Sequence, residues 1–228
     1  MMKLQNEKCY MCNSEATSRE HAPPKSFFPA KNRSNLITVP SCSTHNNDNS
    51  KDVEYVYSFI CSPIQTKEIA REQFSKVLRA FKRNPNLKNL VYKDSEPIFL
   101  PNGQETELVK IDLDRFKSVM RATAYAIYYY SFNKKYFGSF DIFGTNLVPT
   151  KELSEENNNE LSNIRQMLSQ LKFTSLNMPE PEVFGCAVHQ ENSEKFIYEF
   201  TFYGGFKIHA VSIPFYYKTF RQINLKVD

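Results

Sequence analysis

The sequence predicts an α+β fold in three parts: a small N-terminal module held together by a bound metal, central helices, and a small C-terminal antiparallel sheet. Three observations predict it. Residues 1–62 are poor in aliphatic side chains but hold two close pairs of Cys and His residues. Residues 64–83 and 112–132 repeat apolar side chains at helical spacing, and residues 183–213 contain apolar, β-branched and aromatic runs. With 228 residues, the chain is long enough for a substantial core.

The overall composition excludes several classes of protein. Hydrophobic residues make up 41% of the chain and charged residues 24%, which is typical of neither a disordered tail nor a fibrous repeat. No run approaches the roughly 20 apolar residues of a membrane-crossing helix. The first residues also lack the apolar stretch of a secretion signal. We therefore expect a cytoplasmic protein with no membrane partner.

Four residues of the N-terminal module have the types and the spacing of a zinc site. Cys9 and Cys12 form a Cys-x2-Cys pair, and Cys42 and His45 form a Cys-x2-His pair. Together they supply the four donors of tetrahedral zinc, and a structural zinc adds the folding free energy that a thin core lacks. The odd number of cysteines, five, argues against a disulfide framework. The alternative is that Cys9 and Cys12 are free thiols and His45 is a surface residue.

Between and after these pairs stand further residues with catalytic chemistry. Glu20 and His21 precede a proline-containing segment, and Asn46 directly follows the second pair. Two metal-binding knuckles, an acid–His dipeptide between them and an Asn after the last ligand resemble the HNH endonucleases, the ββα-metal nucleases. The resemblance covers residues 8–55. Asn35 is the best match to the middle Asn of that family, although its distance from the second pair is longer than expected.

The resemblance implies a ββα module in which His21 is the general base, Asn35 orients it, and Glu20 and Asn46 hold magnesium or manganese. General chemistry agrees, because imidazole has a pKa of about 6.5 and magnesium prefers oxygen ligands. One geometric condition applies. Adjacent residues of a regular strand point to opposite faces, so Glu20 and His21 serve one site only if the strand ends or bulges there. The prolines that follow favour such an ending.

Positive charge gathers in the middle of the chain. Residues 63–136 hold 14 Lys/Arg and 8 Asp/Glu, whereas residues 1–62 hold 7 and 6 and residues 137–228 hold 8 and 11. We divide the chain at these boundaries into the HNH module, a basic helical region and a C-terminal α+β region. The basic residues are interpreted as phosphate contacts, the alternative being a solvated helix face. The expected nucleic-acid contacts are Lys25, Lys51, Arg71, Arg79, Lys82 and Arg83.

The two central helices follow from apolar spacing and capping. An Asn-Pro dipeptide ends the helix over 64–83. Residues 86–110 are interpreted as loop and short strands, with a turn at 101–103. Asp112 or Asp114 caps the helix that runs to 132. Its last tyrosines, at 128–130, are interpreted as packing residues rather than as a surface on which bases stack.

The C-terminal region begins with a polar linker or helix start over 150–159, followed by a short helix over 160–173. Apolar and aromatic residues then predict strands, which two adjacent glycines connect as a hairpin. The predicted strands are 183–188, 196–203 and 206–213, with the turn at Gly204 and Gly205.

The function predicted is a metal-dependent HNH endonuclease that hydrolyses DNA, with a role in phage defence or restriction. The C-terminal region would supply dimerisation, binding of a regulatory or targeting protein, or target choice. A rival prediction is a non-catalytic zinc-stapled module that binds nucleic acid or a protein. A third is an RNA-cleaving member of the same family.

Overall fold

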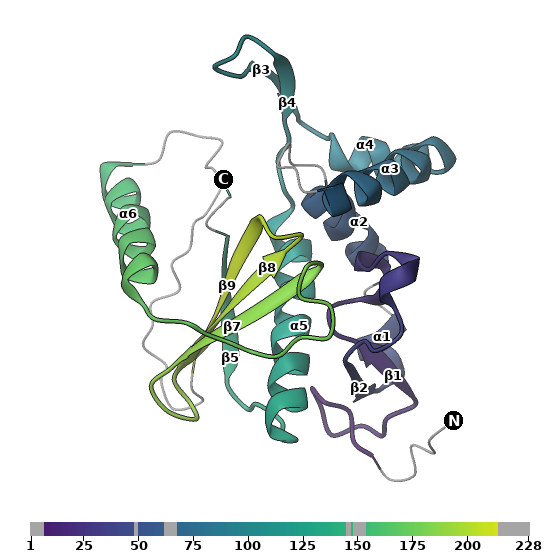
Figure 1. Cartoon of the computed structure of the whole chain (residues 1–228), viewed down its shortest axis with the longest axis vertical. Coiled ribbons are helices and arrows are strands. Elements are labelled where there is room, and N and C mark those ends of the chain that lie inside the picture. The colour runs from purple at the N-terminus through teal and green to yellow at the C-terminus, as the bar shows by residue number, and fades with distance from the viewer. Residues whose placement is uncertain (1–6, 48–49, 62–67, 145–146, 148–153, 214–228) are drawn as a thin grey trace.

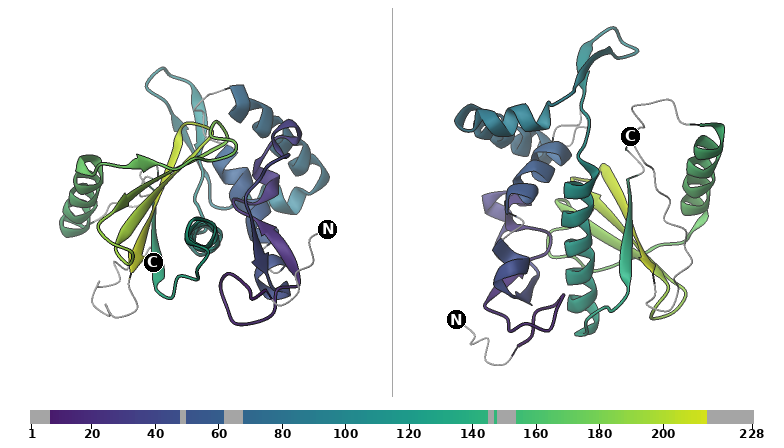
Figure 2. Two further views of the ribbon diagram at one scale, coloured as in Figure 1. Left: turned by 60° about the horizontal axis from the view of Figure 1, so that its bottom comes forward. Right: turned by 180° about the vertical axis from the view of Figure 1, so that it is seen from behind.

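The computed structural model describes residues 7–47, 50–61, 68–144, 147 and 154–213 (Figure 1). Its central element is the long helix α5 (Leu113–Phe132). A unit of two strands and two helices from the N-terminal part lies on one side of α5, and an antiparallel sheet lies on the other (Figure 2). The α+β prediction is therefore confirmed.

The N-terminal unit has two strands followed by helices. Strand β1 (Ser18–His21) pairs antiparallel with β2 (Thr38–Ser41), and α1 (Ser43–Asn47) and α2 (Ser50–Cys61) follow. Two short 3-10 turns lie between the strands. This is the β-β-α order that the resemblance implies. The 3-10 turns are η1 (Lys25–Phe27) and η2 (Ala30–Asn32).

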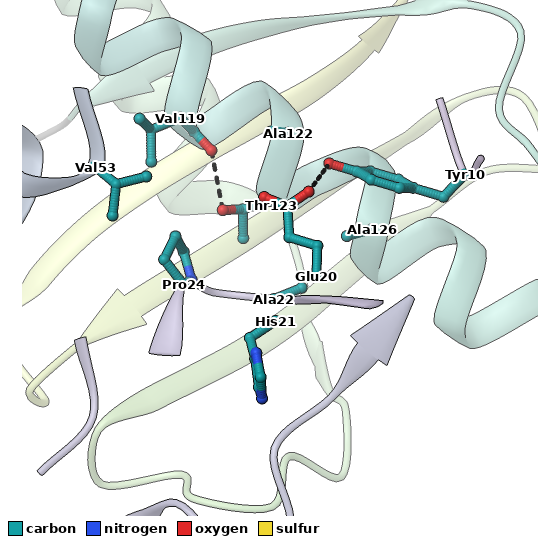
Figure 3. A pocket seen from close by; sticks show the side chains of 10 residues that line it. All are labelled: Tyr10, Glu20, His21, Ala22, Pro24, Val53, Val119, Ala122, Thr123 and Ala126. Atoms are coloured by element: carbon teal, nitrogen blue, oxygen red, sulfur yellow. Dashed lines mark hydrogen bonds between the residues drawn. The ribbon is translucent and has the colours of Figure 1, made fainter. Parts of the chain in front are cut away.

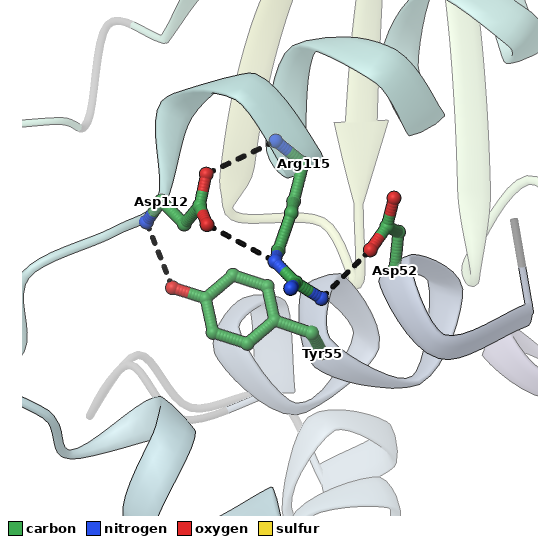
Figure 4. Close-up of polar contacts among 4 residues, drawn as sticks. All are labelled: Asp52, Tyr55, Asp112 and Arg115. Carbon is green, nitrogen blue, oxygen red and sulfur yellow. Dashed lines mark hydrogen bonds and ion pairs between the residues drawn. The ribbon is translucent and has the colours of Figure 1, made fainter.

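Polar contacts at one arginine tie α2 to the start of α5 (Figure 4). The Arg115 guanidinium donates to Asp52 of α2 at 2.8 Å and to Asp112 at 3.0 Å. Asp112 is the N-cap of α5, and its carboxylate also accepts from the Arg115 backbone N–H. The Asp112 backbone N–H donates to the Tyr55 hydroxyl at 2.8 Å. The cap that the sequence indicated for α5 therefore also fixes where α2 packs.

Two helices follow in the middle region, where the sequence predicted one. Helix α3 (Glu68–Arg83) lies within the predicted helix, whose first residues, 64–67, fall outside the described part of the chain. Helix α4 (Pro85–Val91) replaces a predicted loop. The Asn84 side chain accepts from the Leu87 backbone N–H at 3.3 Å, and proline occupies the first helical position. The Asn-Pro dipeptide thus ends one helix and begins the next.

A two-stranded hairpin projects from the body beyond α4 (Figure 1). Strands β3 (Glu96–Phe99) and β4 (Glu105–Leu108) pair antiparallel around the predicted turn. Phe99 on this hairpin is 73% exposed. The short strands predicted here are confirmed.

The C-terminal sheet is antiparallel in the order β5-β9-β8-β7-β6. The sequence predicted its last three strands, which have the longest apolar and aromatic runs. It missed β5 and β6, which are edge strands. The strands are β5 (Ser139–Gly144), β6 (Thr174–Ser175), β7 (Phe184–Gln190), β8 (Phe196–Phe202) and β9 (Phe206–Ile213).

The turn between β8 and β9 lies one residue earlier than predicted. The Gly205 backbone N–H donates to the Phe202 carbonyl at 3.0 Å, so Tyr203 and Gly204 are the central residues. Both have positive φ, 50° and 67°. A tyrosine rarely adopts this backbone, but the Tyr203 hydroxyl donates to the Phe27 carbonyl at 2.8 Å. This long-range contact holds the tyrosine in the turn.

Helix α6 (Glu155–Gln170) starts within the stretch predicted as a polar linker or helix start, because the Ser154 side chain caps it, accepting from the Asn157 backbone N–H at 3.3 Å. Residues 150–153 of the predicted linker are outside the described residues. The helix stands at the side of the sheet (Figure 1), and Leu168 is its one buried residue.

The buried hydrophobic residues of all three predicted regions form one connected core. Helix α5 is buried on two sides, which requires apolar residues around most of its surface. Tyr128 of this helix stacks on Phe196 of β8, and Phe116 meets Phe206 of β9 edge-on. The division into three domains stays a prediction. Among the described residues, no helix has the length and apolar character needed to cross a membrane.

A buried histidine of the sheet makes stability depend on pH. His209 is 3% exposed, and its Nε2 lies 3.2 Å from Glu199. Burial lowers the pKa of His209 below its ordinary 6.5, although the Glu199 charge raises it in part and the Lys207 charge lowers it. Below pH 6.5 the unfolded chain therefore takes up this proton first, and stability declines.

We expect the free energy of unfolding to fall between about pH 7.5 and 5.5, and to fall less in His209→Gln. Urea unfolding of both proteins across this range measures the difference. Equal slopes in the two proteins would show that His209 does not contribute.

Candidate metal centre

Three cysteines and one histidine converge at one end of the β1–β2 hairpin. The ligand atoms of Cys9, Cys12, Cys42 and His45 all lie within 4.8 Å of one another. Cys9 Sγ and Cys42 Sγ are each 3.3 Å from His45 Nδ1, and Cys12 Sγ is 3.8 Å from Cys42 Sγ. Zinc–sulfur bonds of about 2.3 Å in a tetrahedron give a sulfur–sulfur edge of about 3.8 Å. The arrangement therefore fits a metal ion such as zinc.

The donor chemistry agrees with the geometry. Three thiols and one imidazole form one of the ligand sets that zinc prefers. None of the cysteines forms a disulfide. Although burial acts to raise it, hydrogen bonds from Ser14, Cys9 and Cys42 lower the pKa of Cys12 to about 6. A thiolate, the form that binds metal, is thus favoured at Cys12.

Local backbone structure brings the two pairs together. Cys9 and Cys12 lie in a tight turn that is closed by a bridge between Lys8 and Glu15. Cys42 directly follows β2. Lys135, just beyond α5, donates to the Cys12 carbonyl at 2.6 Å and to the Asn13 side chain at 3.2 Å. A metal here would fasten the loop before β1 to the chain after β2.

The carboxylate of Glu20 faces the interior of the protein (Figure 3). Its Oε2 accepts from the Tyr10 hydroxyl at 3.0 Å and from Ser41 at 3.4 Å. Burial raises the pKa of Glu20, and these two hydrogen bonds act in the opposite direction. Oε1 has no hydrogen-bond partner among the described residues, so one carboxylate oxygen is left for a ligand.

Asn46 lies on the same inner face as Glu20. The Asn46 amide donates to Ser18 Oγ at 2.6 Å. Ser18 and Glu20 are two positions apart on β1 and therefore share a face, and Ser41 is paired with Ser18 across the hairpin. The structure thus places the two expected ligands of the divalent ion on one side of the hairpin.

His21 points to the other side (Figure 3). Its register partner is Thr38, and Glu20 pairs with Val39, so the strand runs regularly through both residues without a bulge. Burial, and then the charges of Lys25 and Arg33, lower the pKa of His21. The expected convergence of Glu20 and His21 is not present, because the strand ends after His21 rather than between the two residues.

The space beside Glu20 is small. A cavity of about 10 Å³ lies between β1, Val53 of α2 and one side of α5. That is room for about one water molecule, whereas magnesium usually keeps several waters. The residues of α5 that line this cavity are mostly apolar. The oxygen donors therefore suit magnesium or manganese in type, but the cavity does not fit the hydrated ion. His21 also lines this cavity, although its ring points away from the Glu20 carboxylate. The α5 residues are Val119, Ala122, Thr123 and Ala126.

The other predicted site residues are at the surface. Asn35 is exposed in the segment before β2, at a hollow between the hairpin and the end of α5, and among the described residues no hydrogen bond joins it to His21. Lys25 is also exposed and belongs to the surroundings of His21. The remaining basic residues are exposed on α2 and α3, which supports neither interpretation of them over the other. They are Lys51, Arg71, Arg79, Lys82 and Arg83.

Sequence reasoning missed residues that act through long-range contacts. Arg33 affects His21, and Tyr10 and Ser41 hold Glu20. For Ser41 a signal existed, because alternation along β2 places it on the face of Val39, the register partner of Glu20. Tyr10 and Arg33 lie in loops, where no periodicity indicates direction.

The fold and the cluster define an α+β protein with a Cys3His centre suited to a metal such as zinc. Comparison of the chain with protein-family models, with curated proteins and with solved structures finds no match. The resemblance to HNH endonucleases thus rests on the residues of this chain.

Proposed function

We propose that the protein is a nuclease of HNH type that hydrolyses phosphodiester bonds of DNA, with His21 as general base. The observation that carries the proposal is the placement of Glu20-His21 at the end of a β1–β2 hairpin whose two flanks meet in the Cys3His cluster. A zinc ion there would fix the hairpin, which in turn positions His21.

A base and two cations near the outer face of the hairpin support the proposal. The imidazole of His21 would take a proton from the attacking water. Lys25 and Arg33 lie close enough for their charges to act on His21 and would face the negative scissile phosphate. Arg33 is anchored through its Nε, which donates to the Phe28 carbonyl at 2.9 Å.

The proposal also includes a divalent ion, magnesium or manganese, whose charge would offset that of the phosphate. Glu20 and Asn46 offer oxygens of the right type, but they lie on the inner face beside a cavity too small for the hydrated ion. This requirement therefore stands apart from the roles of His21, Lys25 and Arg33. It is tested with Glu20→Gln, which keeps a hydrogen-bond acceptor for Tyr10 and removes the charge.

The test is incubation of the purified protein with supercoiled plasmid and with RNA, with magnesium, manganese or no divalent ion added. We expect nicked or linear DNA in the presence of a divalent ion. Cleavage that is equally fast without added ions and in Glu20→Gln would remove the ion from the proposal. Cleavage of RNA alone would identify the substrate as RNA.

A second candidate is a non-catalytic module that binds nucleic acid. The observation that favours it is the engagement of Glu20 by Tyr10 and Ser41 on the face opposite His21. This candidate predicts a gel shift with DNA that needs no divalent ion, and no cleavage of any substrate.

A further inference from the structure

A hollow of about 340 Å³ lies between the β1–β2 hairpin and the end of α5. Its walls are residues 35–38, Arg19 of β1, and the end of α5 with Tyr130 and Asn133. This volume is at the lower end of the range for small-molecule sites and matches one nucleotide better than a duplex. We call it the hairpin–α5 hollow.

We propose that the hairpin–α5 hollow binds one unpaired nucleotide of a nucleic-acid strand, with its base stacked on Tyr130. The proposal rests on the proposed function in taking nucleic acid as the ligand. It deepens that function by naming unpaired strands as the substrate class.

The tyrosine in the hollow is available for stacking. Tyr130 is 52% exposed, and among the described residues it makes no ring contact. Tyr128, two residues earlier, is buried against Phe132, Tyr136 and Phe196. The packing interpretation of these tyrosines therefore holds for Tyr128 and is wrong for Tyr130. Stacking on an exposed aromatic ring accepts every base, since each has a π-face.

Polar groups of the hollow suit the rest of a nucleotide. Arg19 is held across the hairpin, with Nε donating to Thr38 at 3.2 Å and Nη1 to Glu7 at 3.3 Å. Its Nη2 has no partner within the described ranges, so it is left to donate to a phosphate. Asn35 and Asn133 are exposed and carry amides that can bond the edge of a base.

The hollow adjoins His21. Thr38, which lines it, is the cross-strand partner of His21, and the β-carbons of such pairs are about 4.5–5.5 Å apart. Arg19 and His21 are two positions apart on β1 and share its outer face. A nucleotide in the hollow with its phosphate on Arg19 would therefore lie on the same face of β1 as the imidazole. Base-paired DNA would not present its base to Tyr130.

The experiment is fluorescence anisotropy of end-labelled oligonucleotides without magnesium or manganese, so that binding is read without cleavage. The probes are single-stranded DNA, single-stranded RNA of the same sequence, and the DNA duplex. Tyr130→Ala is expected to weaken single-strand binding roughly 5- to 150-fold, the range for loss of one stacked base. Duplex binding should not change. Tyr130→Phe keeps the ring and should bind as the wild type does.

Phe99→Ala is the matched control. Phe99 is also an exposed aromatic residue, at 73%, but it lies on the projecting β3–β4 hairpin. Its replacement should leave every affinity unchanged. Equal effects on DNA and RNA would support recognition of base and phosphate, and a preference for one would support a contact to the sugar as well.

Two results overturn the inference: single-strand binding by Tyr130→Ala as tight as that of the wild type, or no binding of any oligonucleotide by the wild type. The outcome is separable from that of the proposed function. If Tyr130→Ala weakens binding but no substrate is ever cleaved, the hollow stands and the nuclease proposal fails. If cleavage requires His21 but Tyr130→Ala binds single strands as tightly as the wild type, the nuclease proposal stands and the proposal for the hollow fails.

Discussion

Replacing Cys42 with serine is expected to remove the metal and unfold the N-terminal unit. Cys42 is 5% exposed, and its Sγ lies within contact of both His45 and Cys12. Zinc binding contributes about 10–16 kcal/mol in small zinc modules, which matches or exceeds the total stability of a typical domain. Because the strands on both sides of the cluster belong to the connected core, the melting temperature of the whole chain should also fall.

The measurement is zinc content by plasma mass spectrometry together with thermal unfolding followed by circular dichroism. The wild type should hold about one zinc per chain. Cys186→Ser is the matched control, because Cys186 is a similarly buried thiol, 4% exposed, on β7 and outside the cluster. It should retain the zinc. A Cys42→Ser protein with full zinc content and an unchanged melting temperature would refute the metal centre.

His21→Ala is expected to slow phosphodiester cleavage by about 10²- to 10⁴-fold, the usual contribution of a general base. The imidazole is half-buried on the outer face of the hairpin, so its loss should change stability by about 1 kcal/mol or less. Initial rates on plasmid with magnesium or manganese measure the effect. Imidazole added to the buffer should restore part of the activity, because it can take over the proton transfer.

The control for this variant is His189→Ala. His189 is also half-buried, but it lies on β7 of the C-terminal sheet, where its ring nitrogen is 3.0 Å from the Lys172 carbonyl. Its replacement should leave the cleavage rate unchanged. Equal rates for His21→Ala and the wild type would exclude His21 from the mechanism.

Much of the fold could be predicted because local signals encode it. The Cys-x2-Cys and Cys-x2-His spacings indicated ligands that meet within 4.8 Å. The apolar period and an aspartate cap, Asp112 or Asp114, predicted α5, and Asp112 is the cap. The aromatic runs predicted β7, β8 and β9. In each case the residues that carry the signal are neighbours in the chain.

The sequence-based predictions missed features that are stabilised by contacts with residues far away in the chain. Strand β5 has a short sequence interrupted by polar residues and forms because it pairs along β9. Tyr203 accepts a positive φ in its turn while its hydroxyl bonds Phe27, a residue far away in the sequence. In the sequence, the Asn-Pro dipeptide indicates the end of a helix. That a second helix, α4, starts there also depends on the burial of Leu87 and Val91.

The sequence by itself determined which chemical groups the protein carries, the ligand pairs of the metal centre, and the helices and strands with the most regular apolar patterns, α3, α5, β7, β8 and β9. Only the tertiary structure decided which way those groups face: Glu20 inward under α5, His21 outward, and Tyr130 into an open hollow. The reason is that spacing and capping act between neighbours in the chain. The buried side of a hairpin is set by whichever distant element packs against it, and here that element is α5.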